Sequence, residues 1–184
     1  MVIRNEQILD AAAEVLVQRP NATLQNIANA AGISRTTIFN RYATREDLLE
    51  ALGAHALQRI AAVMQRIPNP ATGGITAVLL DVTEGLMPLG PHSAFLRRAP
   101  VGDNTIDAHW HEAVAPLVAL FVAAQSRGQL RSQIPIRWLV GSYVSLLFGA
   151  WDEIAVGELG PMQAARLVVD TWLAGTAHSG ADSA

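Results

Sequence analysis

The sequence predicts an all-α protein, and three features support this fold class. Apolar residues recur at intervals of three and four along most of the chain, which is the period of one face of a helix. A sustained alternation of apolar and polar residues, the pattern of a half-buried strand, is absent. Proline and glycine lie between the periodic segments, where they end helices.

The N-terminal segment begins with two predicted helices. Pro20 ends the first of them, because proline cannot continue a helix. Thr23 is in the N-cap position of the second, and Gly32 suits the left-handed turn that follows it. The residues that share the apolar face of the first helix are Ile8, Ala12, Val15 and Leu16.

Two more helices follow directly. Ser34 caps the third, in which Ile38 and Tyr42 are one turn apart and point inward. Thr44 caps the fourth, and Asp47 at its third position completes a short capping box. The fourth helix continues until the sequence PNP stops it.

The rest of the chain predicts five further helices. Pro116 lies inside one of them, so we expect that helix to be kinked or split. The tail TAHSGADSA has little to pack against and is expected to fray. The five helices are expected near residues 74–87, 91–98, 104–127, 136–155 and 161–175.

Composition narrows the class of protein. A chain with 51% hydrophobic and 16% charged residues forms a core rather than a disordered coil. The absence of cysteine excludes disulfides, thiolate metal sites and cysteine nucleophiles. The N-terminus is interrupted by charges, unlike a signal peptide, and the longest apolar runs are shorter than the roughly 18 residues of a membrane span. We therefore expect a cytoplasmic protein with no membrane partner.

The charge of the N-terminal segment differs from that of the whole chain. The net charge of −3 argues against a protein that coats nucleic acid indiscriminately, but a local basic surface can still attract DNA. The chain has no lysine, and the stretch between Glu14 and Glu46 has no acidic residue. The arginines of this stretch are Arg19, Arg35, Arg41 and Arg45.

The helix, glycine turn and helix over residues 24–42 fit a helix-turn-helix, whose second helix enters the major groove. That second helix carries guanidinium, hydroxyl and carboxamide groups, which bind base edges or phosphates. An ordinary solvated helical hairpin is the alternative interpretation. The expected exposed positions are Arg35, Thr36, Thr37, Asn40 and Arg41.

Residues 8–52, ILDAAAEVLVQRPNATLQNIANAAGISRTTIFNRYATREDLLEAL, resemble the N-terminal DNA-binding region of the TetR (tetracycline-repressor) family of transcriptional regulators. The motifs that carry the resemblance are the ILDAA start, the TLQNIANAAGIS core, the aromatic pair of IFNRY and the TREDLL entry to the fourth helix. The resemblance implies an N-terminal three-helix helix-turn-helix DNA-binding domain and a C-terminal helical ligand-binding and dimerisation domain.

The resemblance also implies roles for single residues. Phe39 stands where the family usually has Tyr, so only an apolar contact, for example with a thymine methyl group, remains there. Backbone N–H groups at the helix starts capped by Thr23, Ser34 and Thr44 add anion-binding positions. The implied phosphate contacts are Thr23 and Arg45, the implied base-facing residues are Arg35, Thr36 and Thr37, and the implied groove-lining residues are Phe39, Asn40 and Arg41.

The C-terminal region suggests a second subunit. Acidic residues outnumber arginines over residues 53–184, so this region is unsuited to wrapping DNA. The helices near 136–155 and 161–175 are apolar over more than one face and need cover on both sides. The resemblance implies that they form a four-helix interface of a homodimer; a wholly intrachain core is the alternative. The expected interface residues are Gly141, Ser145, Leu147, Val168 and Trp172.

A chamber for a small-molecule effector is expected within residues 75–127. Met and aromatic residues at helical spacing also occur in ordinary cores, which is the alternative for each of them. The segment DAHWHE is not expected to bind metal, because its two histidines lie on different helix faces. No metal and no cofactor is expected. The candidate ligand-contacting residues are Met87, Phe95, His109, Trp110, His111 and Phe121.

We therefore expect a ligand-responsive, homodimeric DNA-binding transcriptional regulator, a repressor that a small, largely apolar molecule releases from palindromic double-stranded operator DNA. The expected domains are residues 1–46 for DNA binding, 47–176 for ligand binding and dimerisation, and 177–184 as a flexible tail. One alternative is a small α-helical enzyme that uses His109, His111 or Asp107, although no nucleophile–base motif is present. Another is a protein-interaction module whose basic hairpin binds an acidic partner.

Overall fold

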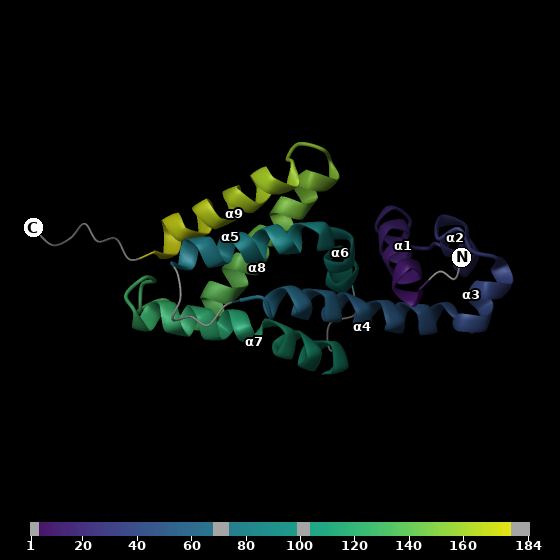
Figure 1. The fold of residues 1–184 in the computed structure, drawn as a ribbon, viewed down its shortest axis with the longest axis horizontal. Coiled ribbons are helices and arrows are strands. Elements are labelled where there is room, and N and C mark those ends of the chain that lie inside the picture. Colours follow the sequence, from purple (N-terminus) through teal and green to yellow (C-terminus); the bar gives the residue numbers. More distant parts are fainter. Residues whose placement is uncertain (1–3, 68–73, 99–103, 178–184) are drawn as a thin grey trace, which may run out of the picture. The chain divides into compact units, whose positions relative to one another are not determined.

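The computed structural model describes residues 4–67, 74–98 and 104–177, without the side chains of residues 98 and 104–108. Within these residues the secondary structure is helical, apart from an isolated bridge between Leu130 and Ala177, so the all-α prediction is confirmed (Figure 1). The described elements are α1 (Asn5–Gln18), α2 (Leu24–Ala30), α3 (Arg35–Arg41), α4 (Arg45–Met64), α5 (Ile75–Leu86), the 3-10 helix η1 (Met87–Leu89), α6 (Gly90–Arg98), α7 (Asn104–Ser126), α8 (Ile136–Ala155) and α9 (Pro161–Thr176).

The chain divides into two compact units. The first comprises residues 1–59 and 89–110, in which α1 packs against α2 and α6, and α2 packs against α3. The second comprises residues 60–88 and 111–184, in which α9 packs against α5 and α8. The first unit thus extends beyond the segment 1–46, because α6 returns to α1. The expected tail lies outside the described residues from position 178 onward.

The predicted helix caps of the N-terminal segment are confirmed. The Thr23 hydroxyl accepts from the backbone N–H of Asn26, and the Ser34 hydroxyl accepts from that of Thr37. Thr44 and Asp47 form the reciprocal capping box: the Thr44 N–H donates to the Asp47 carboxylate at 2.9 Å, and the Asp47 N–H donates to the Thr44 hydroxyl at 3.1 Å. Each cap satisfies backbone groups that the helix leaves unpaired.

Pro116 lies within one continuous helix, so of the two expectations the split of α7 is wrong. Proline removes one backbone hydrogen bond and crowds the preceding turn. The helix continues because its inner face is packed on both sides of the proline, where Val114 and Leu117 are buried. No helix among the described residues is long and apolar enough to cross a membrane.

The core of the second unit contains a cluster of aromatic rings. Phe121 stacks on Trp172 with ring centroids 4.7 Å apart, and the Tyr143 ring meets both rings edge-on. Thr83 donates its hydroxyl proton to the Leu79 carbonyl, so the Tyr143 hydroxyl donates to Thr83 at 2.7 Å. Both buried hydroxyl groups are therefore paired, as the interior requires.

The buried tyrosine gives the second unit a measurable response to alkaline pH. Burial raises the pKa of Tyr143 to about 12, and the hydrogen bond with Thr83 offsets only part of this effect. Because the folded pKa lies above the unfolded value of about 10, this contribution to stability is complete below pH 10 and decreases as the pH rises toward 12. In Tyr143→Phe we expect a loss of about 1 kcal/mol at pH 8 and a smaller decrease between pH 9.5 and 11.5 than in the wild type, measured by urea unfolding. Equal decreases in both proteins would contradict the burial of a neutral phenol.

Candidate nucleic-acid interface

The turn between α2 and α3 has the geometry of a helix-turn-helix (Figure 1). Gly32 has a φ of 66°, the left-handed conformation predicted for it, which residues with a side chain rarely adopt. Ile27 and Ile38 are fully buried, and Tyr42 is nearly so, which fixes the two helices against the core of the first unit. The inward orientation predicted for Ile38 and Tyr42 is confirmed.

The outer face of α3 presents polar and cationic groups to solvent. We call the exposed residues of this helix the α3 face. The Arg35 guanidinium lies over the Phe39 ring, 5.2 Å from its centroid, and Phe39 is 41% exposed. Arg35 and Phe39 are one helical turn apart, and their cation–π contact holds both side chains in place on the surface. The residues of the α3 face are Arg35, Thr36, Thr37, Phe39, Asn40 and Arg41.

Two residues near the start of α3 use their hydroxyl groups internally. The Ser34 hydroxyl accepts from the Thr37 backbone N–H at 3.1 Å and is 2.8 Å from the Thr37 hydroxyl. The Thr23 hydroxyl likewise donates to the Asn26 side chain at 2.8 Å. These groups hold the helix starts, whose outward N–H groups are suited to bind anions.

Arg45 has a structural contact that its sequence position did not indicate. Its Nη2 donates to the Pro20 carbonyl at 2.7 Å and its Nε donates to the Ala22 carbonyl at 3.2 Å. The side chain therefore holds the loop between α1 and α2 against the start of α4. A guanidinium carries five N–H donors, so this arrangement leaves donors for a phosphate. Phosphate binding by Arg45 stays a prediction.

Asn5 is a further positioning residue that sequence reasoning missed. Its Oδ1 accepts from the Tyr42 hydroxyl at 2.7 Å and from Arg41 Nη1 at 3.4 Å. The contact joins the start of α1 to the end of α3. The two partners are 37 and 36 positions away in the chain, so no local pattern signals them.

Four charged or titratable side chains from α1, α4 and α6 of the first unit meet at one point. Sequence reasoning did not connect them. Both His55 Nε2, on α4, and His92 Nε2, on α6, lie within hydrogen-bond distance of Asp10 Oδ1, at 3.0 and 2.9 Å. Arg59 Nη1 donates to Asp10 Oδ1 at 3.0 Å and to Oδ2 at 3.3 Å. We call Asp10, His55, Arg59 and His92 the α1–α4–α6 cluster.

Burial and charge set the protonation of this cluster. Burial raises the pKa of Asp10, but the His55 hydrogen bond, the Arg59 charge and the His92 contact outweigh it and lower that pKa below its ordinary value. Burial lowers the pKa of His92, and the Asp10 carboxylate opposes this only in part. At neutral pH the carboxylate is therefore ionised and the His92 ring is neutral.

The six candidate ligand-contacting residues are divided between the two units. Phe95, His109 and Trp110 belong to the first unit, and Met87, His111 and Phe121 belong to the second. Phe95 packs against the N-terminal core, and Met87 and Phe121 are buried. His109 and His111 are exposed and Trp110 is half-buried, while the side chain of Asp107 lies outside the described residues. Their part in ligand binding stays a prediction.

The expected interface residues lie on two sides of α8 and α9. The chain itself covers Leu147, Val168 and Trp172 and leaves them 2–3% exposed, so their part in an interface stays a prediction. Gly141 and Ser145, by contrast, lie on the exposed side of α8. The large apolar residues exposed on or beside these helices are Trp138 at 68%, Val156 at 71%, Met162 at 66% and Leu167 at 53%.

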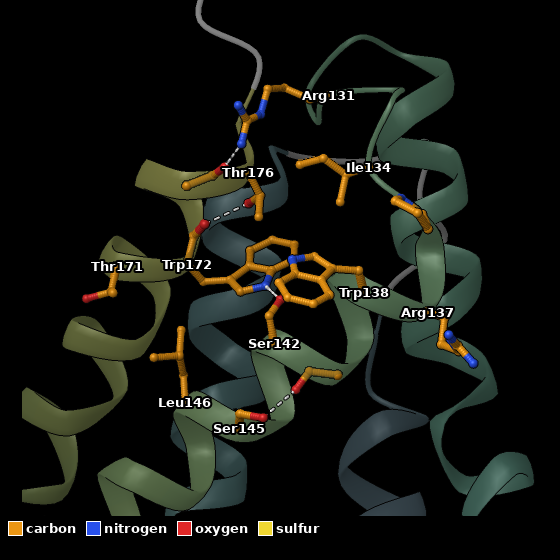
Figure 2. Close-up of a pocket in the computed structure, with 13 residues that line it drawn as sticks. Arg131, Ile134, Arg137, Trp138, Ser142, Ser145, Leu146, Thr171, Trp172 and Thr176 are labelled. Atoms are coloured by element: carbon orange, nitrogen blue, oxygen red, sulfur yellow. Dashed lines mark hydrogen bonds between the residues drawn. The ribbon is translucent and has the colours of Figure 1, made fainter.

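The exposed side of α8 and α9 is hollowed by an open groove of about 890 Å³ (Figure 2). Trp138 and Trp172 lie at its centre, and the Trp172 Nε1 donates to the Ser142 hydroxyl at 3.0 Å. Gly141 and Ser145 continue the groove along α8, and Thr171 borders it from α9. We call this surface the α8–α9 face.

Known proteins resemble the chain over most of its length. Residues 8–52 match the family model of bacterial regulatory proteins of the tetR family. The HTH-type transcriptional repressor LfrR of Mycolicibacterium smegmatis is 41% identical over 152 residues, which cover 82% of this chain and 78% of that protein. The HTH-type transcriptional regulator NfxB of Pseudomonas aeruginosa is 24% identical over 97% of both chains. The crystal structure of LfrR in complex with proflavine superposes with a TM-score of 0.76, covering 92% of this chain and 94% of LfrR, with 28% identity over the paired residues.

Proposed function

The chain belongs to the TetR family of bacterial regulatory proteins, and on this premise we propose that it is a homodimeric repressor whose α3 reads palindromic operator DNA and which a small molecule releases. Two α3 helices of a symmetric dimer would enter successive major grooves, about 34–36 Å apart. The effector would favour a conformation in which this spacing is lost, through a coupling free energy of typically about 1–3 kcal/mol.

The proposal that the protein binds DNA rests on the α3 face. Its guanidinium, hydroxyl and carboxamide groups include the donors that pair with base edges in the major groove. No acidic residue occurs between Glu14 and Glu46, so the surface is locally cationic although the whole chain has a net charge of −3. A salt-dependent gel shift with a palindromic site from beside the protein's own gene tests this part. A palindrome bound no better than a scrambled duplex of the same length would contradict it.

The α8–α9 face supports the homodimer. A single chain leaves Trp138 of α8 and Leu167 of α9 exposed, at 68% and 53%, on two helices that pack against each other, and exposed large apolar side chains occur at interaction surfaces. Gly141, Ser145 and Gly149 carry small or no side chains at intervals of four on α8, which permits close approach of a second helix. We take the occupant to be a second copy of the same face, because a two-fold interface uses one self-complementary surface. The buried Leu147 and Val168 support that face from beneath.

The aromatic cluster of the second unit supports a flat, largely apolar effector. LfrR, which is 41% identical to this chain, has been crystallised with proflavine. In this chain the stacked rings of Phe121 and Trp172 offer apolar faces, and the Thr83–Tyr143 pair adds hydroxyl groups beside them. Ligand sites in proteins combine apolar lining with a few polar groups in this way. A ligand that reaches Phe121 therefore contacts or displaces the Trp172 ring.

The intrinsic fluorescence reports such contact. We expect proflavine to quench the tryptophan emission of the wild type, and Trp172→Phe to remove most of the quenching because phenylalanine keeps the stack but not the fluorophore. Trp138→Phe, which alters a ring that is 68% exposed, is the matched control and should retain the quenching. Quenching that is unchanged in Trp172→Phe would place the effector away from Phe121.

A further inference from the structure

Three helices of the first unit each place a metal-binding group at the same point. Asp10 lies on α1, His55 on α4 and His92 on α6, and their ligand atoms lie within 4.8 Å of one another. We propose that these three side chains bind a divalent transition-metal ion, with Zn²⁺ as the ion whose chemistry fits best. The site is separate from the α3 face and from the aromatic cluster, so it does not depend on the proposed function.

Hydrogen-bond donors crowd one oxygen atom of Asp10. His55 Nε2, His92 Nε2 and Arg59 Nη1 all lie within 3.0 Å of Asp10 Oδ1, whereas among the described residues Oδ2 accepts only from Arg59, at 3.3 Å. A carboxylate has about two acceptor positions on each oxygen, so three donors exceed the capacity of Oδ1. An ion between the two Nε2 atoms and Oδ1 replaces both histidine donors with one bond to the oxygen.

Both imidazole rings of the cluster are buried. His55 and His92 are 7% and 5% exposed. When an ion binds Nε2 of a neutral ring, the proton of that nitrogen moves to Nδ1, and no net proton is lost. Nδ1 of His92 has no hydrogen-bond partner, so no described group opposes this change of tautomer.

The three ligand groups match the preferences of a divalent transition-metal ion. Two imidazoles and one carboxylate suit Zn²⁺, Co²⁺ and Ni²⁺, whereas Mg²⁺ and Ca²⁺ prefer all-oxygen sites. Three protein ligands leave a fourth position for water, as in open zinc sites. The Asp10 side chain is 42% exposed, which gives the ion a path from solvent.

Arg59 distinguishes a metal site from a purely hydrogen-bonded cluster. Its guanidinium competes for the Asp10 oxygens and repels a dication, yet its side chain is 42% exposed and can turn toward solvent. Arg59→Gln should therefore bind Zn²⁺ more tightly than the wild type. If the cluster served only to join three helices, removal of Arg59 would loosen it and improve no affinity.

The test uses the full chain without a histidine tag, after treatment with a chelator. Co²⁺ is titrated while its visible absorption is recorded, and Zn²⁺ affinity is measured by competition with a chromophoric chelator. We expect one ion per chain, with Zn²⁺ binding more than about 100-fold weaker in His55→Gln and His92→Gln, since loss of an outer partner of a ligand already costs about 10–100-fold. His109→Gln, which alters an exposed histidine of α7, is the matched control and should bind like the wild type.

Three results would overturn the site: no Zn²⁺ or Co²⁺ binding by the wild type, equal affinity in His92→Gln and His109→Gln, or weaker binding in Arg59→Gln. Circular dichroism shows whether each variant is folded. If the histidine variants do not fold, the decision passes to Arg59→Gln, whose altered side chain is partly exposed and whose affinity must rise. Because the titration contains no DNA, its outcome is independent of operator binding.

Discussion

Replacing Trp138 by Arg is expected to convert the dimer into a monomer and to abolish tight operator binding. Trp138 lies at the centre of the groove in the α8–α9 face and is 68% exposed in the single chain, so the substitution leaves the core of the chain intact. In the proposed dimer the same change occurs twice because of the two-fold symmetry. Loss of a buried interface Trp costs at least about 2 kcal/mol, and two such losses weaken the dimer by close to a thousandfold.

Loss of the dimer weakens operator binding, because the two half-sites are no longer bound by one linked molecule. A dimer binds its second half-site at a high effective concentration, which raises affinity by about 10²–10⁴ over one half. Light scattering with Trp138→Arg should therefore report a monomer, and anisotropy should report operator binding weaker by at least about 100-fold. Val122→Arg alters another exposed apolar side chain, on α7 at 48% exposure, and is the matched control. A dimeric Trp138→Arg protein would show that the interface lies elsewhere.

Replacing Arg35 by Ala is expected to relax base discrimination, whereas replacing Arg45 by Ala is expected to weaken all DNA binding. Arg35 lies in the first turn of α3 and is supported by Phe39, so its guanidinium fork can pair with guanine O6 and N7. Its loss should cost about 1–3 kcal/mol on the operator and much less on a scrambled duplex. Equal losses on both duplexes would identify Arg35 as a phosphate contact.

Arg45 is a suitable comparison because its guanidinium lies at the start of α4. Loss of one phosphate contact per subunit should make the plot of log K against log[salt] shallower by about 2 for the dimer, at roughly 0.9 per phosphate. The contacts with the Pro20 and Ala22 carbonyls add a second effect, because Arg45→Ala also frees the loop before α2. We therefore expect this variant to unfold at a lower denaturant concentration, while Arg35→Ala does not.

The helices of this protein were predictable because their limits are set locally. Each start near Thr23, Ser34 and Thr44 depends on a hydroxyl that reaches a backbone N–H three residues on. Gly32 similarly marks its own left-handed turn. The exposure of the α3 face followed from the positions of Ile38 and the other inward residues at helical spacing.

Contacts between distant helices were not predictable from such patterns. The three partners of Asp10 lie 45, 49 and 82 residues away, so no spacing rule connects them. For α8 and α9 the pattern was ambiguous in another way, because a helix that is apolar nearly all round does not reveal which side the chain itself covers. Leu147 and Val168 proved to lie on the covered side, and Trp138 and Leu167 on the open side.

The most direct test measures how tightly the wild type binds two labelled duplexes at a series of salt concentrations. One duplex is the palindromic operator and the other is a scrambled sequence of equal composition. Binding is measured by fluorescence anisotropy. If the protein recognises base edges through the α3 face, it should bind the operator at least about 10³-fold more tightly than the scrambled duplex. Binding to both should weaken linearly on a log–log plot as salt rises. Equal affinity for the two duplexes at every salt concentration would contradict the account.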